Sequence, residues 1–325
     1  MSEVYIVHLR AYGFLHPGRE RLGTRVIKRC WSVIPGSTLY GAVAAGLIRL
    51  SCDWQGPEPE TRCKDGQCGR PCEYRNLIDL VKRDDHRLRF SPLVPTTSKI
   101  ETAVAYCAAA AKQKGNTFTT PHAPINRQAM TIHGDQLYGV VGHEPFQEYR
   151  GFIVEEHPAG AHSFMPQIRR SLRMLPFLPF GGWGKFCPVE ARLAEGPLDG
   201  RAFIEGLREA AERNARWLSL LTPSPMQDSG NWLMTSAAEM KVTRLRRYRA
   251  WRVGVYAEHG EDAIYRAEGG EQTPPVLGLP EGSQFRLREE SQLLDELGDQ
   301  FLWGVGNTDW TYLGWGQVIL DGRKT

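Results

Sequence analysis

The sequence of 325 residues contains no long hydrophobic run. No segment approaches the ~20 consecutive apolar residues that a membrane-spanning helix needs, so we expect no transmembrane segment and no membrane partner. The first ten residues, MSEVYIVHLR, are typical of a β-strand and lack the architecture of a secretory signal peptide. We therefore expect a cytoplasmic protein.

The chain also has little net charge. It contains 40 Lys and Arg against 37 Asp and Glu, a formal net charge of +3. A surplus this small does not by itself indicate a nucleic-acid partner, so the distribution of the charge is more informative than its total. The composition, 41% hydrophobic and 24% charged residues, is that of an ordinary globular protein, and the length accommodates two domains.

Cofactor motifs are missing as well. The glycine cluster at residues 181–184, which Lys185 follows, matches neither the six-position dinucleotide pattern nor the Walker pattern. This argues against NAD and ATP as cofactors. An enzyme of small-molecule metabolism that is merely stabilised by zinc has no cofactor motif or carboxylate pair in its support.

Cysteine is concentrated in one segment. Four of the seven cysteines fall within residues 51–76, with ten, four and three residues between them, and this segment has no apolar periodicity. Disulfides are disfavoured in the cytoplasm, whereas four thiolates suit a tetrahedral zinc ion. The spacing is looser than in paired zinc knuckles, so a disulfide pair and free thiols are the alternatives. The predicted ligands of a structural Zn²⁺ are Cys52, Cys63, Cys68 and Cys72, whereas Cys30, Cys107 and Cys187 lie among apolar neighbours and are expected in the core.

A Pro-Gly turn at residues 35–36 precedes a run of small and apolar residues with helical spacing. The pattern predicts a helix over residues 37–50 with Ser37 as its N-cap. Because a helix N-terminus leaves free N–H groups, Gly36, Ser37 and Thr38 are a candidate phosphate seat. A capped core helix without a ligand is the alternative.

Two basic stretches and two glycine-aromatic loops are candidate RNA contacts. Residues 241–252 interleave six cations with two aromatic rings, which a groove for single-stranded RNA requires, although solvated surface would have the same composition. Residues 19–29 form a second basic patch ahead of the predicted helix. The glycine loops let the backbone approach a ligand beside an aromatic ring. The candidate residues are Arg19, Arg21, Arg25, Lys28, Arg29, Trp183, Lys185, Arg244, Arg246, Arg247, Tyr248, Arg249, Trp251, Arg252, Gly314, Trp315 and Gly316.

The pattern of elements predicts an α+β fold. Strands are expected at 3–12, 87–95, 137–141, 151–155, 189–193 and 318–320, and residues 280–287 are expected to form a turn that leads into a strand. The strands at 137–141 and 151–155 are expected to form a hairpin-like pair. Helices are expected at 76–82, 102–112, 198–221 and 289–297. Each half of the chain has an opening strand, a helix, a strand pair, and a glycine-aromatic loop before a last strand, which is the outline of a duplicated ferredoxin-like domain.

Three short stretches resemble the RAMP superfamily of CRISPR-associated proteins. Residues 34–42, Ile-Pro-Gly-Ser-Thr-Leu-Tyr-Gly-Ala, resemble a first-helix motif that many members write Ile-Pro-Gly-Ser-x-Leu-Arg-Gly-Ala, with Tyr40 at the arginine position. Residues 304–306 with 313–316 are similar to the glycine-rich loop that closes RAMP domains, and residues 281–285 resemble the turn before a late strand. The resemblance implies two ferredoxin-like (RRM-like) RAMP domains, residues 1–197 with the cysteine-rich zinc-binding insertion at 51–76, and a smaller domain at 198–325.

The chain most resembles the handle-capping subunit of type III-like effector complexes. This implies binding of the crRNA 5′ handle, contact with RAMP backbone subunits and often with a large or nuclease subunit, access to target RNA or DNA through the complex, and no catalysis. A RAMP backbone subunit is one alternative. The other is a metal-independent endoribonuclease that processes repeat RNA with a histidine general acid or base, for which His8, His16, His122, His133 and His143 are available.

Overall fold

The structure is a computed structural model, and the part of the chain that it describes contains two main antiparallel sheets. In this part no helix has the length and apolar character needed to cross a bilayer. The described residues are 2–17, 27–28, 30–51, 72–80, 86–112, 117–122, 125–126, 131–132, 138–158, 160–177, 180, 187–226, 231–242, 245–248, 276–306, 311 and 313–321.

The first sheet is built from the N-terminal part of the chain. Its strands are β1 (Ser2–Ala11), β3 (Arg87–Phe90), β9 (Glu148–Glu156) and β10 (Val189–Leu193), in the order β10-β1-β9-β3, and all neighbours are antiparallel. In sequence, helix α1 (Gly36–Ser51) lies between β1 and β3, and helix α5 (Met165–Leu172) lies between β9 and β10. Two short strands, β4 (Val94–Pro95) and β11 (Leu198–Asp199), extend the edges. The strands expected at 3–12 and 151–155 and the helix after Pro35 are confirmed.

The second sheet repeats this plan. Its strands are β12 (Trp217–Leu220), β14 (Ala237–Lys241), β17 (Gln284–Leu287) and β18 (Val318–Leu320), in the antiparallel order β14-β17-β12-β18. Helix α8 (Trp232–Ser236) follows the first strand and α10 (Ser291–Trp303) precedes the last. In both sheets the first strand pairs with the last, and the third strand lies between the first and the second.

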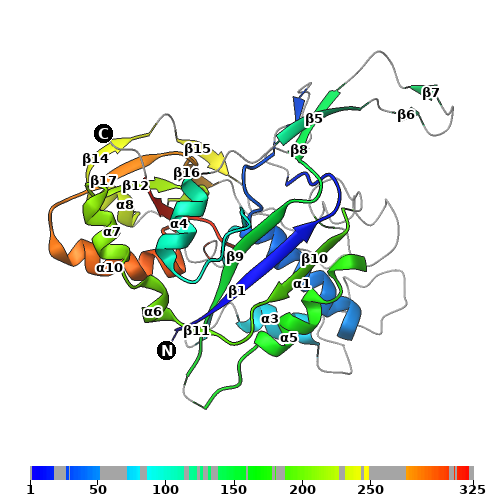
Figure 1. The fold of residues 1–325 in the computed structure, drawn as a ribbon, viewed down its shortest axis with the longest axis horizontal. Helices are drawn as coiled ribbons and strands as arrows, with labels where there is room; N and C mark the ends of the chain where they lie inside the picture. Colours follow the sequence, from blue (N-terminus) through cyan, green and yellow to red (C-terminus); the bar gives the residue numbers. More distant parts are fainter. Residues whose placement is uncertain are drawn as a thin grey trace.

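Smaller elements complete the described part. A three-stranded sheet of β2 (Ile27–Lys28), β8 (Tyr138–His143) and β5 (Thr117–His122) projects away from the rest, together with the β6–β7 pair (Ile125–Asn126 and Thr131–Ile132) (Figure 1). A second three-stranded sheet, β13-β16-β15, lies beside the C-terminal sheet. The remaining elements are α3 (Glu73–Leu80), α4 (Ala103–Ala111), η1 (Leu175–Phe177), α6 (Gly200–Ile204), α7 (Leu207–Arg213), β13 (Ser224–Pro225), β15 (Arg246–Tyr248) and β16 (Val276–Leu279).

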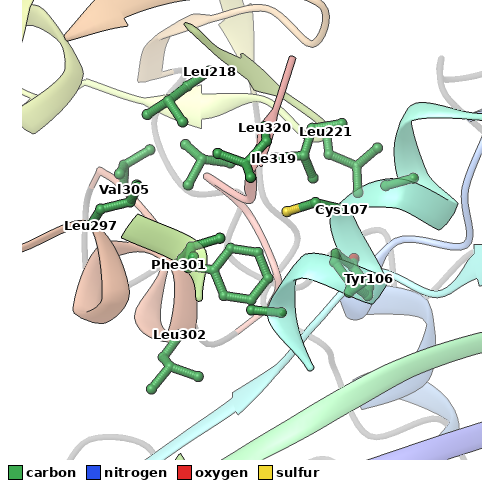
Figure 2. Packing of buried hydrophobic residues seen from close by; sticks show 14 of the residues in the cluster. Tyr106, Cys107, Leu218, Leu221, Leu297, Phe301, Leu302, Val305, Ile319 and Leu320 are labelled. Atoms are coloured by element: carbon green, nitrogen blue, oxygen red, sulfur yellow. The ribbon is translucent and has the colours of Figure 1, made fainter. Parts of the chain in front are cut away.

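Strand β1 contributes to two hydrophobic cores because successive side chains of a strand point to opposite faces. Tyr5, Val7 and Leu9 pack with α1 and α5 in one cluster. Val4 and Ile6 belong to the other cluster, which also contains residues of α4, α10 and the C-terminal sheet. Figure 2 shows this second cluster, where Phe301 of α10 lies beside Tyr106 and Cys107 of α4. The N-terminal sheet therefore lies between its own helices and the C-terminal half.

The expected long helix at 198–221 is wrong. The segment forms β11, α6, α7 and β12 instead, with Asp199 capping α6 through its side chain. Gly206 adopts a left-handed conformation (φ 76°) that separates α6 from α7. The apolar residues after Asn214 alternate into and out of the core as strand β12. The apolar spacing of residues 198–221 fits a helix, so it did not reveal the turn at Gly206 or the strand β12.

The expected hairpin of 137–141 and 151–155 is also wrong. Both strands exist, as β8 and β9, but they belong to different sheets. Strand β8 pairs with β2 and β5, whereas β9 pairs with β1 and β3. The turn at residues 144–147 therefore links two sheets.

Candidate RNA interface

The start of α1 lies at the contact between the two halves. The helix begins at Gly36, so Ser37 lies in its first turn and not at the N-cap position. A Cβ atom on Gly36 would lie 2.1 Å from the carbonyl oxygen of Phe90 and 2.7 Å from that of Leu313. This close backbone packing accounts for the glycine without a ligand. Ser37 and Thr38 are half-buried, and phosphate binding at this turn stays a prediction.

The closing glycine loop forms the other side of that contact. Gly314 is buried with its Cα atom against Gly36, and Gly316 (φ 69°) has no room for a Cβ atom beside the carbonyl of Val305. Trp315 is half-buried against the N-terminal core. The two RAMP-like motifs, far apart in sequence, therefore meet backbone to backbone.

A buried arginine that the sequence reasoning missed crosses the same contact. The guanidinium of Arg89, on β3, donates to the carbonyl oxygens of Thr311 (3.0 Å), Phe301 (3.2 Å) and Leu302 (2.6 Å). The last two carbonyls end helix α10, where the helix dipole favours a cation. Burial lowers the pKa of Arg89 to about 9, so it remains charged at neutral pH. Arg89 therefore fixes the N-terminal sheet to α10.

Many predicted RNA contacts lie outside the described residues. These are Arg19, Arg21, Arg25, Arg29, Trp183, Lys185, Arg244, Arg249, Trp251 and Arg252. Lys28 lies in β2, and Arg246, Arg247 and Tyr248 form β15, paired with β16, and their backbones alone are described. Lys241, at the start of the second stretch, is exposed, with its ammonium 4.3 Å from the ring centroid of Trp217.

The cysteine segment falls largely outside the described residues too. Cys52, Cys63 and Cys68 are among those not described, so the zinc site stays a prediction. Cys72 is a half-buried free thiol just before α3, and its carbonyl oxygen accepts the amide of Asn76. Cys107 and Cys187 are buried, as expected, whereas Cys30, also expected in the core, is half-buried. Burial raises the pKa of Cys107 to about 12.

The described residues include a row of basic side chains that no sequence motif predicted. His8 on β1 lies directly opposite Arg150 on β9 and Arg192 on β10, so these three side chains share one face of the N-terminal sheet. Arg192 is exposed and His8 is half-buried, whereas the side chain of Arg150 is only 13% exposed and its guanidinium lies 3.9 Å from the carboxylate of Glu148. Burial, and then the two guanidinium groups, lower the pKa of His8, which is therefore neutral at pH 7. Arg192 is therefore the exposed cation of this row.

Aromatic rings flank the row on the same face. Arg10 lies over the ring of Tyr12 at 5.2 Å, and Tyr12 meets Phe146 edge to face at 6.4 Å. The side chain of Phe146 is 68% exposed, and its backbone is left-handed (φ 63°), which is rare for a bulky residue. Arg10 lies directly opposite Glu190 and Glu148, and the hydroxyl of Tyr12 donates to Glu190 (2.8 Å). The exposed ring of Phe146 offers a surface on which an unpaired base could stack.

Two of the candidate histidines are structural. His16 and His143 are buried, and their ring nitrogens lie 2.5 Å from the carbonyl of Val141 and 2.8 Å from that of Trp31. Burial lowers the pKa of His143. His122 is described as backbone in β5, and His133 lies outside the described residues. Of the five, His8 alone has a described side chain that reaches solvent beside cationic groups.

Comparison with known proteins gives similarity in structure only. No protein-family model matches the chain, and no curated protein matches it. Chains of type III-B Cmr-beta complexes bound to cognate target RNA are similar at a TM-score of 0.42 and 9% identity. One, from a complex with AMPPnP, covers 86% of this chain and 85% of its own, and another covers 98% and 97%.

Cmr6 from Pyrococcus furiosus is similar at a TM-score of 0.33 and 11% identity, over 58% of this chain and 98% of its own. The structural neighbours of the chain thus include subunits of type III-B CRISPR complexes.

Proposed function

We propose that this chain is a non-catalytic RNA-binding subunit of a CRISPR-Cas effector ribonucleoprotein, which caps the 5′ handle of the crRNA and contacts RAMP backbone subunits in antiviral defence. The observation that carries the RNA-binding part is the row Arg150–His8–Arg192 beside Tyr12 and Phe146. Guanidinium groups contact phosphates, and exposed rings stack on unpaired bases. The capping role rests on the sequence resemblance.

The order of the strands supports the domain assignment. Both sheets have the connection β-α-β-β-α-β with the order 4-1-3-2 that a ferredoxin-like domain requires. We therefore assign one ferredoxin-like RAMP domain to residues 1–197 and a second to 198–325.

The proposal includes a structural Zn²⁺ held by Cys52, Cys63, Cys68 and Cys72. The half-buried free thiol of Cys72 just before α3 is compatible with a ligand at the end of the inserted segment. Zinc would tie that segment to the helix and supply folding energy rather than chemistry. Neighbouring backbone subunits, a large or nuclease subunit, and target RNA or DNA would be met through the complex.

One observation favours a second function, processing of repeat RNA by the chain itself. His8 is neutral at pH 7 and lies between two arginines, which is an arrangement that suits a general base beside a phosphate whose developing charge needs stabilisation. A RAMP backbone subunit, with the same fold, is the remaining alternative.

The first experiment is purification of the native complex from its own cells, with mass spectrometry, RNA sequencing and zinc measured in one sample. Co-purification with a short guide RNA and other RAMP proteins, with one copy of this chain per guide RNA, would support the capping role. Several copies of this chain per RNA would instead indicate a backbone subunit, and a lone protein without RNA would contradict the proposal.

The purified chain is also incubated with repeat RNA, as wild type and as His8→Ala. We expect binding without site-specific cleavage in both. Site-specific cutting by the wild type that His8→Ala abolishes would overturn the non-catalytic proposal and establish the processing function.

A further inference from the structure

We propose that Glu3, Glu155 and His157 bind a divalent metal ion at the end of the N-terminal sheet, away from the cysteine segment. One ligand atom from each of these side chains lies within 4.8 Å of the others. Within the described part of the chain, no other group of three or more such side chains comes this close together. The site is independent of the proposed RNA-binding function.

The two carboxylates are forced together by the strand register. Glu3 on β1 lies directly opposite Glu155 on β9, so both side chains project from the same face. Like charges directly opposite each other destabilise a strand pair. A cation between them would reverse that effect.

The Glu155 side chain is held in place before any metal arrives. It is fully buried, and its carboxylate accepts from the imidazole of His86 (3.0 Å), the amide of Phe164 (2.6 Å) and the hydroxyl of Ser163. An ionised carboxylate has about four acceptor positions, so these three donors orient it and leave one for a metal. Hydrogen bonds of this kind raise metal affinity by fixing the ligand.

The other two proposed ligands make the site accessible to a metal ion from solvent. Glu3 and His157 are half-buried, and His157 lies in the loop that leaves β9. The ring of His86 lies 5.8 Å from that of His157, so two imidazoles flank the carboxylate pair. Carboxylate and imidazole together suit Mn²⁺ or Zn²⁺, and Mn²⁺ avoids thiolates.

Mn²⁺ is therefore the probe, because the cysteine segment does not compete for it. Full-length wild type, Glu3→Gln, His157→Ala and the control His162→Ala are titrated with Mn²⁺, and free Mn²⁺ is followed by electron paramagnetic resonance. His162 is an exposed histidine of the same loop outside the cluster. Glu155 is left unchanged because it also binds the amide at the start of α5.

We expect one saturable Mn²⁺ in the wild type and in His162→Ala. Each ligand variant should bind at least about tenfold more weakly, because loss of an orienting partner alone has that effect. Mn²⁺ should also raise the melting temperature of the wild type but not of His157→Ala. If Glu3→Gln has a lower melting temperature than the wild type in the absence of metal, the test of the metal site rests on His157→Ala alone. No saturable site in the wild type, or wild-type affinity in His157→Ala, would overturn the proposal.

Discussion

Arg89 is the residue on which the contact between the two halves depends most. Its guanidinium is fully buried, and its described partners are carbonyl oxygens at the end of α10 and in the closing loop. A buried charge is costly unless its hydrogen bonds are made. The carbonyls at the C-terminus of α10 supply both acceptors and a favourable dipole. Strand β3 is thereby tied to a helix more than 200 residues away in sequence.

Arg89→Met should therefore lower the free energy of unfolding by about 1–3 kcal/mol, because the buried carbonyl of Leu302 loses its donor. The carbonyls of Thr311 and Phe301 keep the amide of Gly314 and the side chain of Gln317. The measurement is chemical denaturation followed by fluorescence. Arg173→Met, at an exposed position after α5, is the control and should change stability by less than about 0.5 kcal/mol. Equal stability of the two variants would show that the guanidinium contributes nothing net at this contact.

At the scale of elements, two of the three glycines of helix α1, Gly36 and Gly41, have opposite surroundings. Gly36 packs against the carbonyls of Phe90 and Leu313, whereas a Cβ atom on Gly41 would meet nothing within 4 Å. The same substitution in one helix should therefore have opposite effects. The glycine at the start is required by packing, and the one inside the helix only costs backbone entropy.

Gly41→Ala should raise the free energy of unfolding by roughly 0.5–1 kcal/mol, the helix propensity gained over glycine. Gly36→Ala should lower it by about 1–3 kcal/mol, because the chain must move to admit the methyl group. Thermal melts of both variants beside the wild type measure the two shifts. Destabilisation by Gly41→Ala, or none by Gly36→Ala, would contradict the packing at the start of α1.

The sequence predicted those elements that have a sharp local signal. Pro35 marks the start of α1 to within one residue, and the apolar run of Val4, Tyr5 and Ile6 marks β1, which buries side chains on both faces. The segment 198–221 failed because Phe203, Leu207, Ala210 and Leu218 fit a helical period, while Gly206 breaks it locally. The row of His8, Arg150 and Arg192 was beyond reach, because only strand register brings these residues together. The burial of Arg89 could not be predicted from the sequence, because an arginine in a strand is usually exposed.

At the scale of the whole molecule, the RNA-binding proposal rests on two regions of the chain. One is the row on the N-terminal sheet with Arg10, Tyr12 and Phe146, and the other is the basic stretch 241–252 at β15. The stretch 241–252 contains six cations and no acidic residue, whereas Arg10 on the N-terminal sheet lies opposite Glu148 and Glu190. A guide RNA that follows both surfaces would contact phosphates in each half of the protein.

Removing two cations from either surface should therefore weaken binding of single-stranded repeat RNA and flatten its salt dependence, by about 0.7 in the log–log slope for each phosphate that the variant no longer neutralises. We expect this for Arg10→Ala with Arg192→Ala, and for Arg247→Ala with Arg249→Ala, in fluorescence anisotropy titrations over a range of salt. Lys99→Ala with Arg213→Ala removes two exposed cations elsewhere and should leave the slope unchanged. A surface whose variant binds RNA like the control is not part of the RNA path, and if neither variant differs from the control, the RNA-binding proposal fails at the whole-molecule scale.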